Sequence, residues 1–129
     1  MATKRRYYGI KFPFTCNNLD EHFLDLNEEI EGKVASDIIH VLLTPKRTRI
    51  HMPDFGTDII KYVFEQNDQN TWGDIEKEAK TCVARYVNNV DVTKIEVVST
   101  DNDREKILHV IYRVVQGNKS TDNELVVRI

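Results

Sequence analysis

The chain has 129 residues, 40% of them hydrophobic and 30% charged, and its formal net charge is −3. This length and balance predict a single globular domain with a core of its own. Basic and acidic residues are spread along the chain, which excludes a domain-wide basic field for nucleic acid. No apolar run approaches the ~18 residues of a membrane-spanning helix, and the two cysteines, Cys16 and Cys82, form no CxxC pair. We therefore expect a protein made in the cytoplasm that contacts neither nucleic acid nor membrane and holds no cofactor or metal.

The first 19 residues are expected to form an extended aromatic arm, and residues 20–129 to form a single domain. Pro13 lacks an amide hydrogen, which excludes a helix in the arm. Four apolar side chains of the arm share one parity, as in a strand with one buried face, and they are Tyr8, Ile10, Phe12 and Phe14. The sequence leaves open whether this arm packs on its own domain or on a neighbour.

A first helix is predicted from Asn27 to Leu43, after a short strand at 22–26. The Asn27 side chain can accept a hydrogen bond from an early helix amide, and Pro45 stops the helix. Apolar residues recur along it at helical spacing: Ile30, Val34, Ile38 and Val41. A hairpin-like connection with short strands at 48–51 follows.

Two further helices are predicted before residue 90. Thr57 caps a short helix that runs through Phe64, with an apolar face made by Ile59, Ile60, Val63 and Phe64. A polar loop follows at 66–70. Thr71 and Asp74 then approximate a capping box for a third helix, which ends at Asn88-Asn89.

The remainder of the chain reads as β structure. Strands are predicted at 95–100, at 107–115 and at 124–129, with turns at 101–103 and 116–122, because β-branched residues alternate there with polar ones. Three antiparallel strands need a hydrophobic cover, which the amphipathic helices provide. The predicted fold class is α+β, with about three helices packed on a small antiparallel sheet formed mainly by the C-terminal half.

The middle of the chain resembles the GPW-type baseplate wedge family of contractile phage tails, which is similar to a subunit of type VI secretion baseplates. Four segments carry the resemblance: the helix end Leu42-Leu43-Thr44, then Arg49, then Pro53-Asp54-Phe55-Gly56, and finally Val63-Phe64. The opening Gly9-Ile10-Lys11-Phe12-Pro13-Phe14 also resembles the family pattern. One element departs: the family's Glu-Pro-Arg after an aromatic residue is replaced, behind Tyr86, by Val87-Asn88-Asn89.

The kept motif has a structural interpretation. Pro53 fixes its own φ, and Asp54 can accept hydrogen bonds in a turn. Phe55 would anchor the turn in the core, while Gly56 permits a positive φ. We expect a rigid internal brace, of which only Arg47 and Arg49 face outward.

The resemblance implies a structural subunit of the virion, assembled in the host cytoplasm into a sixfold hetero-oligomeric baseplate. Its implied partners are the helical core bundle of the larger wedge proteins and the tail sheath protein, whose first ring it would template by strand pairing. The strands expected to pair are 107–115 and 124–129. The expected docking residues are Arg47, Tyr86, Val87, Asn88, Asn89, Val110, Tyr112, Val126 and Ile129.

Two other functions stay open beside this non-enzymatic one. Family members sometimes carry a lysozyme label, and a peptidoglycan-degrading enzyme would need two carboxylates, for which Asp54, Glu65 and Asp74 lie beside aromatic residues. No nucleophile motif is present, and the four histidines, His22, His40, His51 and His109, are isolated in sequence. A small nucleic-acid-binding module would use the basic start of the chain, Lys4-Arg5-Arg6, with Tyr7 and Tyr8.

Overall fold

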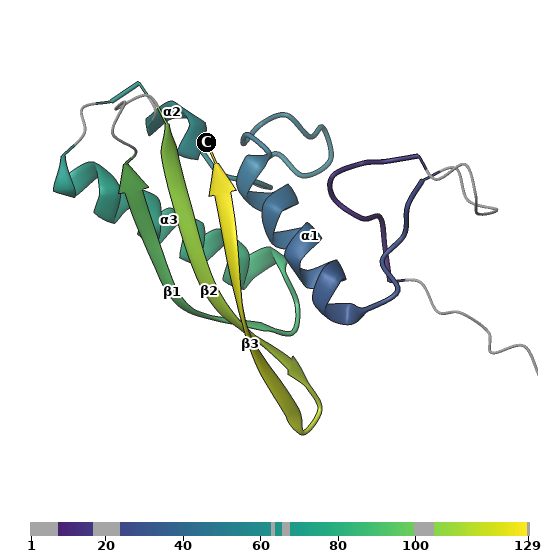
Figure 1. The fold of residues 1–129 in the computed structure, drawn as a ribbon. Coiled ribbons are helices and arrows are strands. Elements are labelled where there is room, and N and C mark those ends of the chain that lie inside the picture. Colours follow the sequence, from purple (N-terminus) through teal and green to yellow (C-terminus); the bar gives the residue numbers. More distant parts are fainter. Residues whose placement is uncertain (1–7, 17–23, 63, 66–67, 100–104, 129) are drawn as a thin grey trace, which may run out of the picture.

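The computed structural model describes residues 8–16, 24–62, 64–65, 68–99 and 105–128. Within them three helices lie across one face of a three-stranded antiparallel sheet (Figure 1), which confirms the predicted α+β class. The elements are α1 (Ile30–Leu43), α2 (Ile59–Tyr62), α3 (Gln69–Tyr86), β1 (Val90–Ser99), β2 (Lys106–Gln116) and β3 (Lys119–Arg128). None of the helices in these ranges is long and apolar enough to cross a membrane.

The central strand of the sheet is β2, which pairs with β1 along one edge and with β3 along the other. Its side chains alternate between a buried and a more exposed face. Val110 and Tyr112 belong to the buried set and point into the core, so the expectation that their side chains dock a partner is wrong. The expectation that 107–115 pairs with a foreign strand is also wrong, because both of its edges are already occupied.

The aromatic arm folds back on its own chain over residues 8–16. Its backbone runs beside residues 25–27, with hydrogen bonds from Tyr8 N to Asn27 O (2.9 Å) and from Asn27 N to Gly9 O (2.8 Å). The short strand predicted at 22–26 reduces, in the described residues, to one bridge between Ile10 and Leu26. The Phe12 amide donates to Ser36 Oγ (3.2 Å), which fixes the arm to α1.

The starts of the helices differ from the predicted ones because polar side chains bind elsewhere. Asn27 does not cap α1, whose N-cap is Glu29; its buried amide donates instead to Ile10 O (3.2 Å) and Ser36 Oγ (3.3 Å). α3 begins at Gln69, and Asp68 caps it by accepting from the Thr71 amide (2.7 Å).

Two predicted strand boundaries also shift, and one segment that was expected to contain strands forms a loop. β1 begins at Val90, five residues before the predicted start. The turn predicted at 116–122 shrinks to Gly117-Asn118, so that β3 begins at Lys119. The 48–51 segment lies in a loop rather than in strands.

The core lies between the helices and the covered face of the sheet. Its most buried members have 0% of their surface exposed and come from α1, α3 and β2: Ile38, Ile75, Ala79, Val83, Leu108 and Val110. Each large apolar side chain withdrawn from water in this way contributes about 2 kcal/mol. The helices are therefore fixed to the sheet mainly by aliphatic packing.

Replacing Leu108 by Ala should lower the free energy of unfolding by about 3 kcal/mol, because a fully buried side chain would leave a cavity. Val98→Ala, in the neighbouring strand, is the matched control, since 47% of that side chain is exposed. Urea denaturation of both variants measures the difference. Equal losses would mean that the two faces of the sheet are buried to the same extent.

Candidate functional site

The segment that carries the resemblance forms a loop between α1 and α2 that is held against the end of α1. The Thr57 amide donates to Thr44 O (2.9 Å), and Thr57 Oγ1 donates to Leu42 O (2.7 Å). Thr57 therefore ties the loop to α1 rather than capping α2 as predicted. Gly56 lies at the closest approach, with φ of 103°, and a Cβ added there would stand 2.1 Å from Thr44 O. Only glycine fits this position on both counts.

An aromatic and cationic stack connects this loop to the end of α3. Phe55 is buried, and its ring centroid lies 4.9 Å from that of Tyr86. The Arg49 guanidinium carbon lies 3.9 Å from the Phe55 centroid, and Arg49 Nη2 is 2.9 Å from His40 Nε2. Tyr86 Oη completes the connection by donating to Asp54 O (2.8 Å). Arg49 is therefore part of the brace and does not simply face outward.

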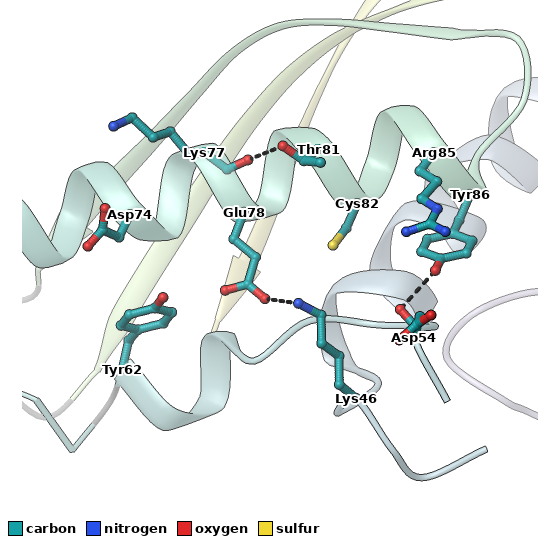
Figure 2. A pocket seen from close by; sticks show the side chains of 10 residues that line it. All are labelled: Lys46, Asp54, Tyr62, Asp74, Lys77, Glu78, Thr81, Cys82, Arg85 and Tyr86. Atoms are coloured by element: carbon teal, nitrogen blue, oxygen red, sulfur yellow. Dashed lines mark hydrogen bonds and ion pairs between the residues drawn. The ribbon is translucent and has the colours of Figure 1, made fainter. Parts of the chain in front are cut away.

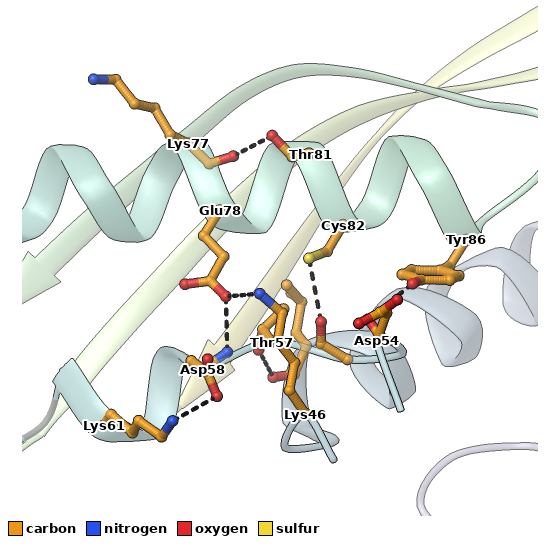
Figure 3. A network of polar contacts seen from close by, with 12 residues as sticks. Lys46, Asp54, Thr57, Asp58, Lys61, Lys77, Glu78, Thr81, Cys82 and Tyr86 are labelled. Carbon is orange, nitrogen blue, oxygen red and sulfur yellow. Dashed lines mark hydrogen bonds and ion pairs between the residues drawn. The ribbon is translucent and has the colours of Figure 1, made fainter. Parts of the chain in front are cut away.

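Beside this stack lies a hollow of about 470 Å³, between α3 and the loop (Figure 2). Its lining residues include side chains of both charges: Lys46, Asp54, Tyr62, Asp74, Lys77, Glu78, Thr81, Cys82, Arg85 and Tyr86. At its base the Glu78 carboxylate accepts from Lys46 Nζ (2.8 Å) and from the Asp58 amide (2.9 Å) (Figure 3). These contacts at the base of the hollow hold the loop against α3.

Two groups of this hollow that form hydrogen bonds between the loop and α3 have raised pKa values. The hydrogen bond to Glu78 raises the pKa of Lys46 above its usual 10.5, against the opposing effect of burial. Burial raises the pKa of the Cys82 thiol, which donates to Gly56 O (3.2 Å). Both groups therefore stay protonated at neutral pH: Lys46 donates from the loop to α3, and Cys82 donates from α3 to the loop.

The remaining expected site residues are dispersed. Phe64 does not belong to a buried face of α2, since the helix ends at Tyr62 and 89% of Phe64 is exposed. Val87 is buried, so its side chain is not available to a partner, whereas Asn88 and Asn89 are exposed. Arg47 and Val126 are exposed as well, while Val63 and Ile129 lie outside the described residues.

The carboxylates considered for hydrolysis are exposed. Asp54 and Asp74 line the same hollow, and Glu65 lies outside it. Among the described residues, no three histidines, cysteines or carboxylates gather in a way that could hold a metal ion. The most enclosed carboxylate of the hollow is Glu78, which the sequence analysis does not identify. Its contacts with Lys46 Nζ and the Asp58 amide hold the loop to α3.

The family described as baseplate wedge protein gp25 matches residues 28–119, which is most of the chain. The α+β domain with its braced loop is thus of the baseplate wedge type, and the chain belongs to the baseplate wedge protein gp25 family. Its structure is similar to that of a protein from Geobacter sulfurreducens named as a candidate tail lysozyme. The two share 25% sequence identity with a TM-score of 0.69, over 78% of this chain and 90% of the other. No curated protein shows significant similarity.

Gly56→Ala should destabilise the protein by about 3 kcal/mol or more, since it adds both a strained φ and a collision with backbone. Gly117→Ala is the matched control: Gly117 also has a positive φ, 57°, but nothing lies within 4 Å of the added Cβ. The control should lose only about 1 kcal/mol. Thermal and urea denaturation compare the two, and similar losses would contradict the close approach.

The Lys46–Glu78 contact predicts a dependence of stability on alkaline pH. The pKa of Lys46 is raised on folding, so its contribution is complete below the unfolded value near 10.5 and is lost as pH rises through the higher folded value. Lys46→Met should therefore lower stability at neutral pH and flatten the decline above about pH 10.5. Lys80→Met, at an exposed position of α3, should keep the original slope. Melting temperatures across this pH range provide the measurement.

Proposed function

We propose that this chain is a structural wedge subunit of a contractile-tail baseplate, and that it templates the first sheath ring by accepting a strand of the sheath protein along β3. Family membership supports the baseplate role. The observation that supports strand pairing is the outer edge of β3, with which no other described strand pairs. On its inner side all ten residues of β3 are in unbroken antiparallel register with β2. Such an edge offers backbone donors and acceptors to another chain.

The two edges of the sheet are not equally suited to a new strand. β1 carries an irregularity between Val92 and Lys94, which bends a strand and disrupts pairing. Because β3 has no such interruption, it is the edge we assign to the sheath strand.

The β2–β3 turn identifies which backbone groups of β3 face away from β2. Gly117 and Asn118 form a two-residue turn in which only Gly117 has a positive φ, as in a type II′ hairpin. The Gln116–Lys119 pair that closes such a turn exchanges hydrogen bonds, and the pattern then alternates. Residues 120, 122, 124, 126 and 128 therefore direct their amides and carbonyls to the free edge.

The second contact we propose is between the end of α3 and the helical core bundle of the larger wedge proteins, in a sixfold assembly. Tyr86 is held by Phe55 and Asp54, so the segment after it leaves α3 in a fixed direction. Asn88 and Asn89 are exposed directly beyond it. Their side-chain amides replace the charged pair of the family's Glu-Pro-Arg as the donors and acceptors for this docking.

A second candidate function is peptidoglycan hydrolysis, which the name of the Geobacter sulfurreducens neighbour brings into consideration. It would need one carboxyl group held as a proton donor in an apolar cleft. The most enclosed carboxylate of the hollow, Glu78, already accepts from an ammonium and an amide. This arrangement supports the structural function over the enzymatic one, which would require turnover that is lost in Asp54→Asn.

Val126→Pro should block sheath assembly while leaving the domain folded. The proline removes an outward-facing amide from β3 and no hydrogen bond to β2. Val126→Thr changes the same side chain but keeps the amide, and it should assemble normally. Counting sheathed tails by electron microscopy, in phage that produce each variant, gives the result. Normal sheaths with the proline variant would contradict strand pairing at β3.

A further inference from the structure

The loop at residues 46–53, here called the tip loop, is fixed in place by its own contacts. The Arg47 amide donates to Pro53 O (2.8 Å), which closes the loop at its base. Thr48 Oγ1 donates to Pro45 O (2.8 Å), and the Phe55 amide donates to Met52 O (3.0 Å). Together with the anchored Lys46 and Arg49 side chains, these bonds restrain the loop at both of its ends.

The apex of this loop carries two exposed apolar side chains, one on each side of the exposed His51 in sequence. Ile50 is 93% exposed and Met52 is 48% exposed. An isolated exposed aliphatic side chain is ordinary on a protein surface. Here, however, a tightly hydrogen-bonded loop presents two of them at its end, so little conformational entropy would be lost when a partner buries them.

The charged side chains of the tip loop itself are all positive. Lys46, Arg47 and Arg49 lie in the tip loop, and no acidic residue occurs between positions 46 and 53. Lys46 is already paired with Glu78, and Arg49 is stacked on Phe55. Arg47 is exposed and forms no ion pair within the described part of the chain. The Arg47 guanidinium is therefore not used by an ion pair there, three positions before Ile50 in the same loop.

We propose that the tip loop inserts into a pocket of another tail protein that has an apolar floor and a carboxylate rim. Ile50 would fill the pocket, with Met52 beside it. Arg47 would form a two-pronged hydrogen bond with a carboxylate at the rim. This contact uses residues outside β3 and outside the segment after α3, and it does not depend on strand pairing.

The arrangement favours a protein partner over an anionic membrane surface. Membrane attraction grows with the number of basic side chains near the surface, and two of the three cations here are engaged within the domain. One free guanidinium in the same loop as a protruding apolar side chain suits a protein pocket that must hold that side chain in one orientation. Guanidinium groups also match carboxylates in geometry better than ammonium groups do.

The test uses tail particles that contain the full chain with p-benzoylphenylalanine in place of Ile50. Irradiation and mass spectrometry should give cross-links to one peptide of another tail protein, with Asp or Glu close to the linked residue. The same photoreactive residue at Val98, also exposed, is the control position. Cross-links to lipid, to a second copy of this chain, or no more protein cross-links than from position 98 would overturn the inference. Absence of the chain from tail particles would instead contradict the proposed function.

Substitutions in the tip loop test the chemistry of the same contact. Ile50→Ser should reduce incorporation into particles about tenfold with an unchanged melting temperature, as for an interface anchor. Arg47→Ala should act similarly, and Arg47→Lys should restore only part of the loss because it keeps the charge without the two-pronged geometry. Full incorporation of both Ile50→Ser and Arg47→Ala would overturn the proposal.

Discussion

The contact between Gly56 and Thr44 is the constraint on which the rest of the loop depends. A backbone carbonyl occupies the space where any side chain at position 56 would begin. Because the chain can pass so close, the Thr57 amide reaches Thr44 O and its hydroxyl reaches Leu42 O. These two bonds satisfy carbonyls at the end of α1 that have no partner within the helix. The connection therefore turns tightly there instead of running out into solvent.

That tight turn determines what the neighbouring side chains can touch. It directs Phe55 inward, where the ring meets Tyr86 from α3 on one side and Arg49 on the other. It also brings the Gly56 carbonyl to the Cys82 thiol. Helices α1 and α3 are thus joined through the loop as well as through the core. A contiguous set of contacts runs from Thr44 to the end of α3, and the segment after α3 takes its starting direction from it.

The fold class and most elements could be predicted from the sequence because they rest on periodicity. The aliphatic stripe of α1 and the alternation of β2 are local patterns that packing then follows. The order of the strands in the sheet cannot be predicted from such a local pattern. The alternation of 107–115 shows one buried face but not which edges are occupied, and the short turn at Gly117 was hidden within polar residues that in fact belong to β3.

The site was less predictable, because its contacts join residues that are distant in sequence. Lys46 and Glu78 are 32 residues apart, and so are Asp54 and Tyr86. No spacing rule connects such pairs. The surfaces that these contacts leave exposed are informative, however. The brace occupies Arg49 and Lys46, β2 is enclosed on both edges, and the helices cover one face of the sheet. Among the described residues, the β3 edge, the residues after α3 and the apex of the tip loop stay exposed, which is why the proposed contacts use them.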